Sequence, residues 1–115
     1  MNELEKIAER LEQFAIKRDW NKFHSPKNLS MALSVEVAEL VEEFQWLTEK
    51  QSSKLSSDKL AKVKDEVADI FIYLIRLSSK LNINLIYAAN DKIIKIDNKY
   101  PVEKAKGNAK KYNEF

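Results

Sequence analysis

The sequence predicts an all-α fold, a four-helix bundle assembled as a homo-oligomer. The chain of 115 residues contains one Gly and two Pro, which is few for a turn-rich β protein. Its longer segments repeat apolar residues at three- and four-residue spacing, the period of an amphipathic helix. At this length one compact domain is expected over residues 1–115, with a basic, loosely ordered tail from about residue 101.

Helix boundaries follow from capping residues and prolines. The predicted helices span residues 2–18, 28–49, 58–81 and 84–99. Pro26 lies in an irregular connector before the second helix, and Pro101 follows the fourth. Polar residues able to cap the third and fourth helices are Ser56, Ser57, Asn82 and Asn84.

The second and third helices are apolar over more than one side. Around the second, one apolar face is formed by Leu33, Val37, Leu40, Val41 and Phe44, and a separate set by Met31, Val35, Ala38 and Trp46. A helix wetted along one side would not show this pattern, and so short a chain can hardly cover both faces. We therefore expect a symmetric homodimer or a homotetramer built as a dimer of dimers.

Charge and composition exclude several classes of protein. With 20 basic against 18 acidic residues, the net charge of +2 gives no reason to expect nucleic-acid or membrane binding. No apolar run resembles a signal peptide or a membrane span. The absence of cysteine excludes disulfides and thiolate metal sites, and it suits the reducing cytoplasm. A soluble cytoplasmic protein is the simplest interpretation.

Acidic residues occur inside the two most apolar helices. In the second, Glu36, Glu39 and Glu43 fall within about 60° of one another on a helical wheel, and Glu42 is displaced to the side. In the third, Glu66 and Asp69 repeat the three-residue spacing. Such like charges repel inside a bundle unless a cation joins them.

Two packed helices could point these acids at one shared ion. Carboxylates without cysteine or clustered histidine suit a hard divalent ion such as Mg²⁺, which is commonly held together with substrate phosphates. Two alternatives stay open: solvated acids that pair with lysines in a non-catalytic interaction module, and a di-iron bundle. The latter needs ExxH on two helices, but the only histidine, His24, lies outside both acidic patterns.

Several motifs together resemble the MazG-like all-α nucleoside triphosphate pyrophosphohydrolases. They are EVAE at 36–39, EFQW at 43–46, DEVADIFIYL at 65–74 and KYPVEKAKG at 99–107. The upstream RDWNKFHSPKNL, residues 18–29, resembles the branch that includes the dCTP pyrophosphatases. The likeness covers about residues 7–112 in the order found in the family.

This resemblance implies an enzyme that cleaves a nucleoside triphosphate between its α and β phosphates with Mg²⁺, for which Mn²⁺ can substitute. By matching position, the metal ligands would be Glu36, Glu39, Glu66 and Asp69. One acid would take a proton from the attacking water, with Glu39 the first candidate and Glu42 the second. dCTP or a related deoxynucleotide would be the favoured substrate, in a role of nucleotide-pool housecleaning.

The resemblance also implies a nucleoside pocket, lined at Trp20, His24, Asn28, Trp46 and Tyr73. Aromatic faces there can stack on a base. Taken one by one, the aromatic residues are also consistent with plain core, His24 with a local hydrogen bond, and Asn28 with a helix cap.

Lysines near the C-terminus are candidates for phosphate contact. Lys92 and Tyr100 match family positions, and Lys95 adds a compact charge beside them. The chain also departs from the dCTP-type pattern, because Ile96 stands where that branch has Asn four residues before the Tyr of YP. One phosphate or sugar contact therefore does not transfer.

Overall fold

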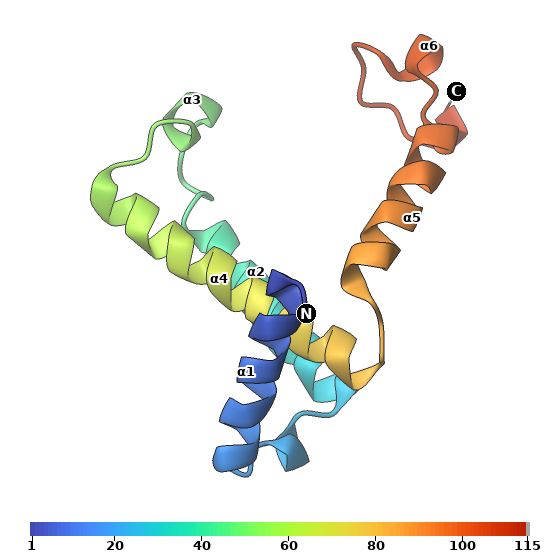
Figure 1. Cartoon of the computed structure of the whole chain (residues 1–115). Helices are drawn as coiled ribbons and strands as arrows, with labels where there is room; N and C mark the ends of the chain where they lie inside the picture. The colour runs from blue at the N-terminus through green and yellow to red at the C-terminus, as the bar shows by residue number, and fades with distance from the viewer. Residues whose placement is uncertain (115) are drawn as a thin grey trace. The chain divides into compact units, whose positions relative to one another are not determined.

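The structure, a computed structural model, describes residues 1–114. These residues contain six α-helices, two short 3₁₀ turns and no strand, which confirms the all-α prediction (Figure 1). The count of four helices was wrong, because two helices of a single turn join the four long ones. The chain forms two compact units, Met1–Asn82 and a second that begins at Ile83, and each is described by itself. No helix among the described residues is long and apolar enough to cross a membrane.

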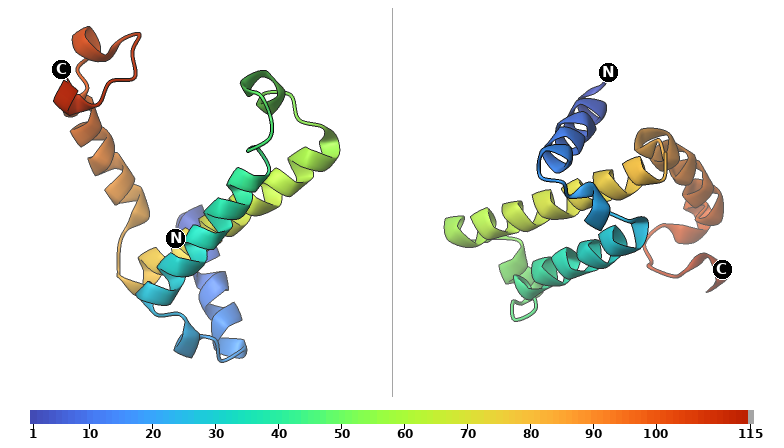
Figure 2. Two further views of the ribbon diagram at one scale, coloured as in Figure 1. Left: turned by 180° about the vertical axis from the view of Figure 1, so that it is seen from behind. Right: turned by 90° about the horizontal axis from the view of Figure 1, so that it is seen from below.

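The first unit is built on an antiparallel helix pair. Helix α2 (Pro26–Glu42) lies along helix α4 (Ser57–Lys80), and helix α1 (Glu3–Lys17) crosses α4 (Figures 1 and 2). A 3₁₀ turn, η1 (Asn21–Phe23), belongs to the connector between α1 and α2. The core is small: its fully buried apolar side chains are Ala15, Leu29 and Ile75, one from each of the three helices.

Side-chain caps fix where the helices begin. Ser25 caps α2, Ser56 caps α4 and Asn84 caps the later helix α5, each by accepting a hydrogen bond from a backbone N–H three residues on. The last two were among the predicted caps. Asn28 does not cap α2, because its own N–H donates to the Ser25 hydroxyl at 3.1 Å.

Helix α2 ends at Glu42, seven residues before its predicted end. The chain tightens there, since the N–H groups of Glu43 and Phe44 bond to carbonyls three residues back. A separate helix α3 (Glu49–Ser52) then begins with a capping box between Thr48 and Gln51. The T-x-x-Q spacing that signals this start is present in the sequence, and it was missed because the apolar pattern continues past Glu42.

The second unit contains helix α5 (Leu85–Lys99), the short helix α6 (Val102–Ala105) and the 3₁₀ turn η2 (Tyr112–Glu114). Two one-turn elements, α6 and η2, thus lie in the tail that was expected to be loosely ordered. Its aromatic rings hold it locally: Tyr100 meets Tyr112 edge to face at 6.4 Å, and the Lys99 ammonium lies 4.7 Å from the Tyr112 ring.

Helix α1 ends in a left-handed turn made without glycine. Asp19 has φ of 53°, and its N–H and that of Trp20 bond back to the carbonyls of Ile16 and Ala15. This is the double hydrogen bond of a Schellman motif, in which glycine is usual because a Cβ is strained at positive φ. The turn directs Trp20 and the connector back toward α1.

We therefore expect Asp19→Gly to be more stable than Asp19→Ala by about 1 kcal/mol, because both variants lose the exposed ion pair to Lys22 but only glycine relaxes the backbone. Urea unfolding of the two variants measures the difference. Equal stability would show that the turn at Asp19 is not strained.

Candidate metal and nucleotide site

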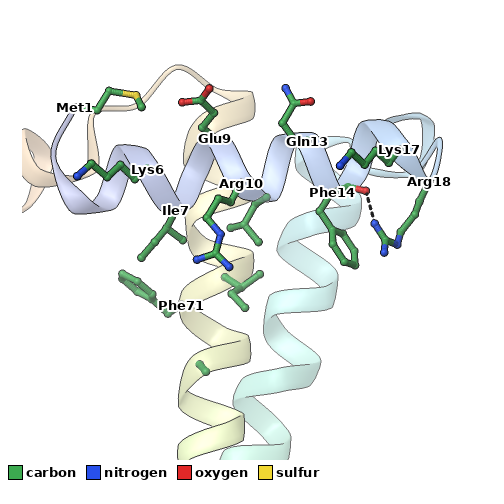
Figure 3. A pocket seen from close by; sticks show the side chains of 13 residues that line it. Met1, Lys6, Ile7, Glu9, Arg10, Gln13, Phe14, Lys17, Arg18 and Phe71 are labelled. Carbon is green, nitrogen blue, oxygen red and sulfur yellow. Dashed lines mark hydrogen bonds between the residues drawn. The ribbon is translucent and has the colours of Figure 1, made fainter.

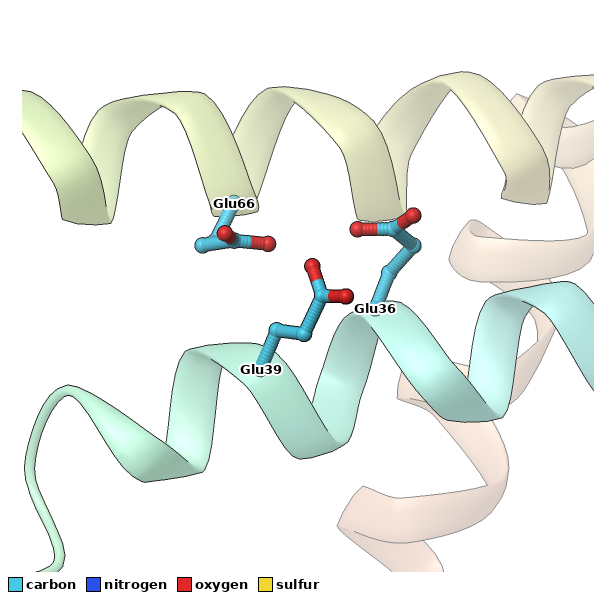
Figure 4. Close-up of side chains that lie close together, drawn as sticks. All are labelled: Glu36, Glu39 and Glu66. Atoms are coloured by element: carbon cyan, nitrogen blue, oxygen red, sulfur yellow. The ribbon is translucent and has the colours of Figure 1, made fainter.

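Three carboxylates from two helices converge between α2 and α4. Glu36 and Glu39 lie one turn apart on α2, and Glu66 faces them from α4 (Figure 4). Each offers an oxygen, and these three oxygens all lie within 4.8 Å of one another. The antiparallel packing thus brings together acids that are about 30 residues apart in the chain.

The cluster is crowded with like charge and partly removed from water. One carboxylate oxygen of Glu36 and one of Glu66, Oε2 in each, are buried and have no hydrogen-bond partner within residues 1–114. Burial, followed by the hydrogen bond and the charge of Glu39 and by the charge of Asp69, raises the pKa of Glu36 to about 7. Burial and Glu39 likewise raise the pKa of Glu66.

This donor set fits a hard divalent cation. Carboxylate oxygens are the ligands that Mg²⁺ and Mn²⁺ prefer, and a cation between them would offset the burial and the repulsion that raise both pKa values. It would also give the two orphaned oxygens a partner. Asp69, the fourth predicted ligand, is half-buried and outside the 4.8 Å group, but its charge acts on Glu36.

The two acids at the end of α2, Glu42 and its C-cap Glu43, lie outside the cluster. Glu43 bonds to the Lys59 ammonium at 2.9 Å, so it ties the end of α2 to the start of α4. Glu42 is exposed at the last position of the helix. Glu43 therefore points toward α4 like the acids of the cluster, but its partner is a lysine of the protein itself.

Trp46 does not lie on the second helix, where the sequence analysis placed it. Helix α2 ends four residues before it, and Trp46 is 87% exposed in the turn that follows. Tyr73 is half-buried on α4, one turn beyond Asp69. A role for either residue in nucleoside binding stays a prediction.

The side chains of the connector residues Trp20 and His24 are in contact. Their rings meet edge to face at 6.3 Å, and Trp20 also meets the Phe14 ring at 5.5 Å. The Asn28 side chain turns back and donates to the Phe23 carbonyl at 3.0 Å, which braces the connector.

His24 also belongs to a polar network that the sequence analysis missed. The buried Arg76 of α4 donates to Glu12 of α1, to Asn21 Oδ1 at 2.9 Å and to His24 Nδ1 at 3.2 Å, and Lys80 donates to Asn21 Oδ1 at 2.7 Å. Arg76 pairing lowers the pKa of Glu12.

A sequence signal for this network did exist. On α4 the polar side chains follow one another at spacings of three and four residues, through Glu66, Asp69, Tyr73, Arg76 and Lys80. They therefore share one face of the helix.

The predicted phosphate contacts lie in the second unit. Lys95 pairs with Asp91 at 3.1 Å, one turn back on α5. Lys92 is exposed on the same helix, and Tyr100 ends it. Their contact with phosphate stays a prediction, as does the effect of Ile96, which is exposed.

A separate groove of about 940 Å³ runs along α1 and contains none of the predicted site residues. Ile7, Phe14 and Phe71 give it an apolar lining, and several basic side chains stand around it (Figure 3). At one end the Arg18 guanidinium lies 3.5 Å from the centre of the Phe14 ring and donates to the Phe14 carbonyl. Its lining contains no cluster of carboxylates, so the groove is not a candidate metal centre.

Comparison with known proteins gives one consistent result. The model of the MazG-like family matches residues 31–115. The human and mouse proteins named dCTP pyrophosphatase 1 are 36% and 37% identical over 114 residues, which is 97% of this chain and 67% of theirs. A crystal structure of a pyrophosphatase from Archaeoglobus fulgidus superposes with a TM-score of 0.83 at 37% identity, over 88% of this chain and 94% of that one.

The family resemblance of the motifs is thus confirmed over most of the chain, and the all-α fold agrees with that of a solved pyrophosphatase. The chain belongs to the MazG-like family of all-α nucleoside triphosphate pyrophosphohydrolases.

Proposed function

We propose that this protein is a Mg²⁺-dependent pyrophosphohydrolase that converts a deoxynucleoside triphosphate, dCTP or a related nucleotide, to the monophosphate and pyrophosphate. The observation that carries the proposal is the set of three facing carboxylates on α2 and α4, two of them with a buried oxygen that has no partner among residues 1–114. Relatives named dCTP pyrophosphatase support the choice of substrate. Removal of unwanted nucleotides from the pool is the role that follows.

Glu36, Glu39, Glu66 and Asp69 would hold the metal in this proposal. A bound Mg²⁺ supplies positive charge to the phosphate oxygens and lowers the pKa of water. Glu39 is the preferred acceptor for the proton of the attacking water, because it lies between the other two carboxylates in Figure 4. Glu42 is the second candidate, and its exposed position argues against it.

The nucleoside would bind toward the connector between α1 and α2. Trp20, His24 and Asn28 belong to that connector or to the start of α2, and Tyr73 lies on the acidic face of α4. An aromatic ring stacked on a base contributes ~1–3 kcal/mol. Trp46 would add a further ring, and Lys92, Lys95 and Tyr100 would contact the phosphates.

We further propose that the protein acts as a homodimer or a homotetramer. Large apolar side chains on α2 are exposed in the single chain, among them Met31, Val35 and Val41, each more than half accessible. Exposed apolar surface on this scale is typical of an interface. A second chain would cover it and give Trp46 a partner.

A screen of purified protein against all dNTPs and NTPs tests the reaction and its specificity together. With Mg²⁺ we expect pyrophosphate and monophosphate from dCTP or a base-modified relative, and none after excess chelator. If no nucleotide released pyrophosphate with Mg²⁺ or Mn²⁺, the proposed function would be wrong.

Separate substitutions distinguish the acids. We expect Glu39→Gln to lower kcat by at least about 100-fold, since it removes both a metal ligand and the preferred proton acceptor. Asp65→Asn is the matched control, because Asp65 precedes Glu66 on α4 but is exposed, and its variant should retain the parent rate. A large loss in Glu42→Gln with activity kept in Glu39→Gln would assign the proton transfer to Glu42.

The raised pKa of Glu36 predicts how stability depends on pH without metal. Its value of about 7 lies above the usual value of 4.5, so folding favours the protonated acid. That contribution is complete below about pH 4.5 and is lost as the pH rises through 7. In chelator we expect Tm to fall between pH 5 and pH 8, and to fall less in Glu36→Gln.

Mg²⁺ should reverse this loss, because it binds the deprotonated carboxylates and therefore stabilises the protein more at pH 8 than at pH 5. Thermal unfolding with and without Mg²⁺ at both pH values measures the effect. A shift in Tm that is the same at pH 5 and pH 8 would contradict binding at these acids.

A further inference from the structure

Arg76 is the least expected residue of the first unit. It is a cation on an otherwise largely apolar stretch of α4, only 3% exposed, and the proposed reaction gives it no part. A buried guanidinium is costly unless partners satisfy it. Its partners come from α1 and from the connector, so it joins three separate segments of the chain.

The terminal nitrogens of Arg76, Nη1 and Nη2, can be assigned to those partners one by one, whereas its buried Nε has no partner within residues 1–114. Nη1 donates to the Glu12 carboxylate, and the two hydrogens of Nη2 serve Asn21 Oδ1 at 2.9 Å and His24 Nδ1 at 3.2 Å. Asn21 is itself held, because its Nδ2 donates to Glu12 Oε1 at 3.0 Å and its Oδ1 also receives Lys80. The guanidinium therefore has a fixed position next to the His24 ring.

This contact determines where the His24 proton lies. Arginine has five N–H donors and no acceptor, so the His24 Nδ1 that it contacts must be the acceptor. A neutral imidazole with an unprotonated Nδ1 carries its hydrogen on Nε2. The other tautomer, and the imidazolium, would each set an N–H against an N–H.

We propose that Arg76 is a positioning residue that locks His24 as the neutral Nε2–H tautomer and so makes it a permanent hydrogen-bond donor in the nucleoside pocket. Its ligand would be an acceptor atom, a carbonyl oxygen or unprotonated ring nitrogen of the base. The assignment of that ligand rests on the proposed function, whereas the tautomer does not.

The charges around the ring act in the same direction. Burial lowers the pKa of His24, and the positive charges of Arg76 and Lys80 on α4 lower it further, against a smaller opposing effect from Glu12 on α1. The Trp20 ring, from the connector, adds no charge. These effects favour the neutral imidazole, in agreement with the contact between Arg76 and Nδ1.

Arg76 and the acidic cluster lie on the same face of α4. Arg76 lies on the face of α4 that carries Glu66, Asp69 and Tyr73, ten residues from Glu66, or ~15 Å along the helix axis. His24 thus stands at one end of the face whose middle carries the acids. The arrangement suits a ligand whose phosphates and base are held at different heights along the helix.

Nitrogen NMR of the imidazole tests the tautomer directly. His24 is the only histidine in the sequence, so a ¹⁵N-labelled sample gives one pair of ring signals without assignment. At pH 7.5 without nucleotide we expect an unprotonated Nδ1 and a protonated Nε2. An Nδ1–H tautomer, or shifts averaged between the two, would overturn the proposal whether or not any variant folds.

Two variants separate the effect of Arg76 from a general loosening. Arg76→Met removes the donor, and we expect averaged ring shifts together with a raised pKa of His24. Glu12→Gln breaks the ion pair but leaves the contact of Arg76 with His24, and the wild-type tautomer should persist. Wild-type ring shifts in Arg76→Met would overturn the proposal.

The ligand is tested with a non-hydrolysable dCTP analogue. We expect the His24 Nε2 signal to move on binding, and KM for dCTP to rise at least about tenfold in His24→Leu but much less in His24→Gln, whose amide can still donate. An unmoved Nε2 signal in a sample that binds the analogue would overturn the role of His24 as a donor. If no nucleotide binds or is cleaved at all, the proposed function fails while the tautomer stands on its own measurement.

Discussion

Repulsion between carboxylates across the α2–α4 interface is the constraint on which the rest of the site depends. A helix pair normally buries apolar side chains along its seam, yet here Glu36, Glu39 and Glu66 occupy the middle of it. Burial, together with the neighbouring carboxylates, raises the pKa of Glu36 and Glu66, and buried oxygens are left with no partner among the described residues. Such an arrangement lowers the stability of the metal-free protein, and it is the arrangement that a divalent cation would stabilise.

Toward the two ends of α4, buried or partly buried charges are paired with side chains of the protein itself. At one end Glu43 pairs with Lys59, and at the other Arg76 is bonded to Glu12, Asn21 and His24. The Glu43–Lys59 pair ties the end of α2 to α4, and the bonds of Arg76 hold α1 and the connector against α4. Along this seam, no cation from within residues 1–114 pairs with the three central acids. The paired charges therefore serve the structure, whereas the unpaired acids are available to bind a ligand.

Local signals in the sequence were enough for most helices and for the acidic pairs. Apolar spacing and the caps Ser56 and Asn84 place α4 and α5 to within one residue, because both depend on neighbours within one helical turn. The same reasoning failed beyond Glu42, where an apolar pattern continues through a turn. In the tail, ring contacts such as that of Tyr100 with Tyr112 join residues twelve apart, beyond the reach of a pattern within one helical turn.

The sequence by itself determined the all-α class, the three-residue spacing of the acids on each helix and the membership of the family. Only the tertiary structure decided which acids meet, because contact across α2 and α4 depends on their antiparallel register and not on spacing within either helix. It also decided that Arg76, although it follows Tyr73 on the same face, is buried against α1 and the connector. A helical wheel gives the direction of a side chain, but the partner that it meets is set by how separate helices pack.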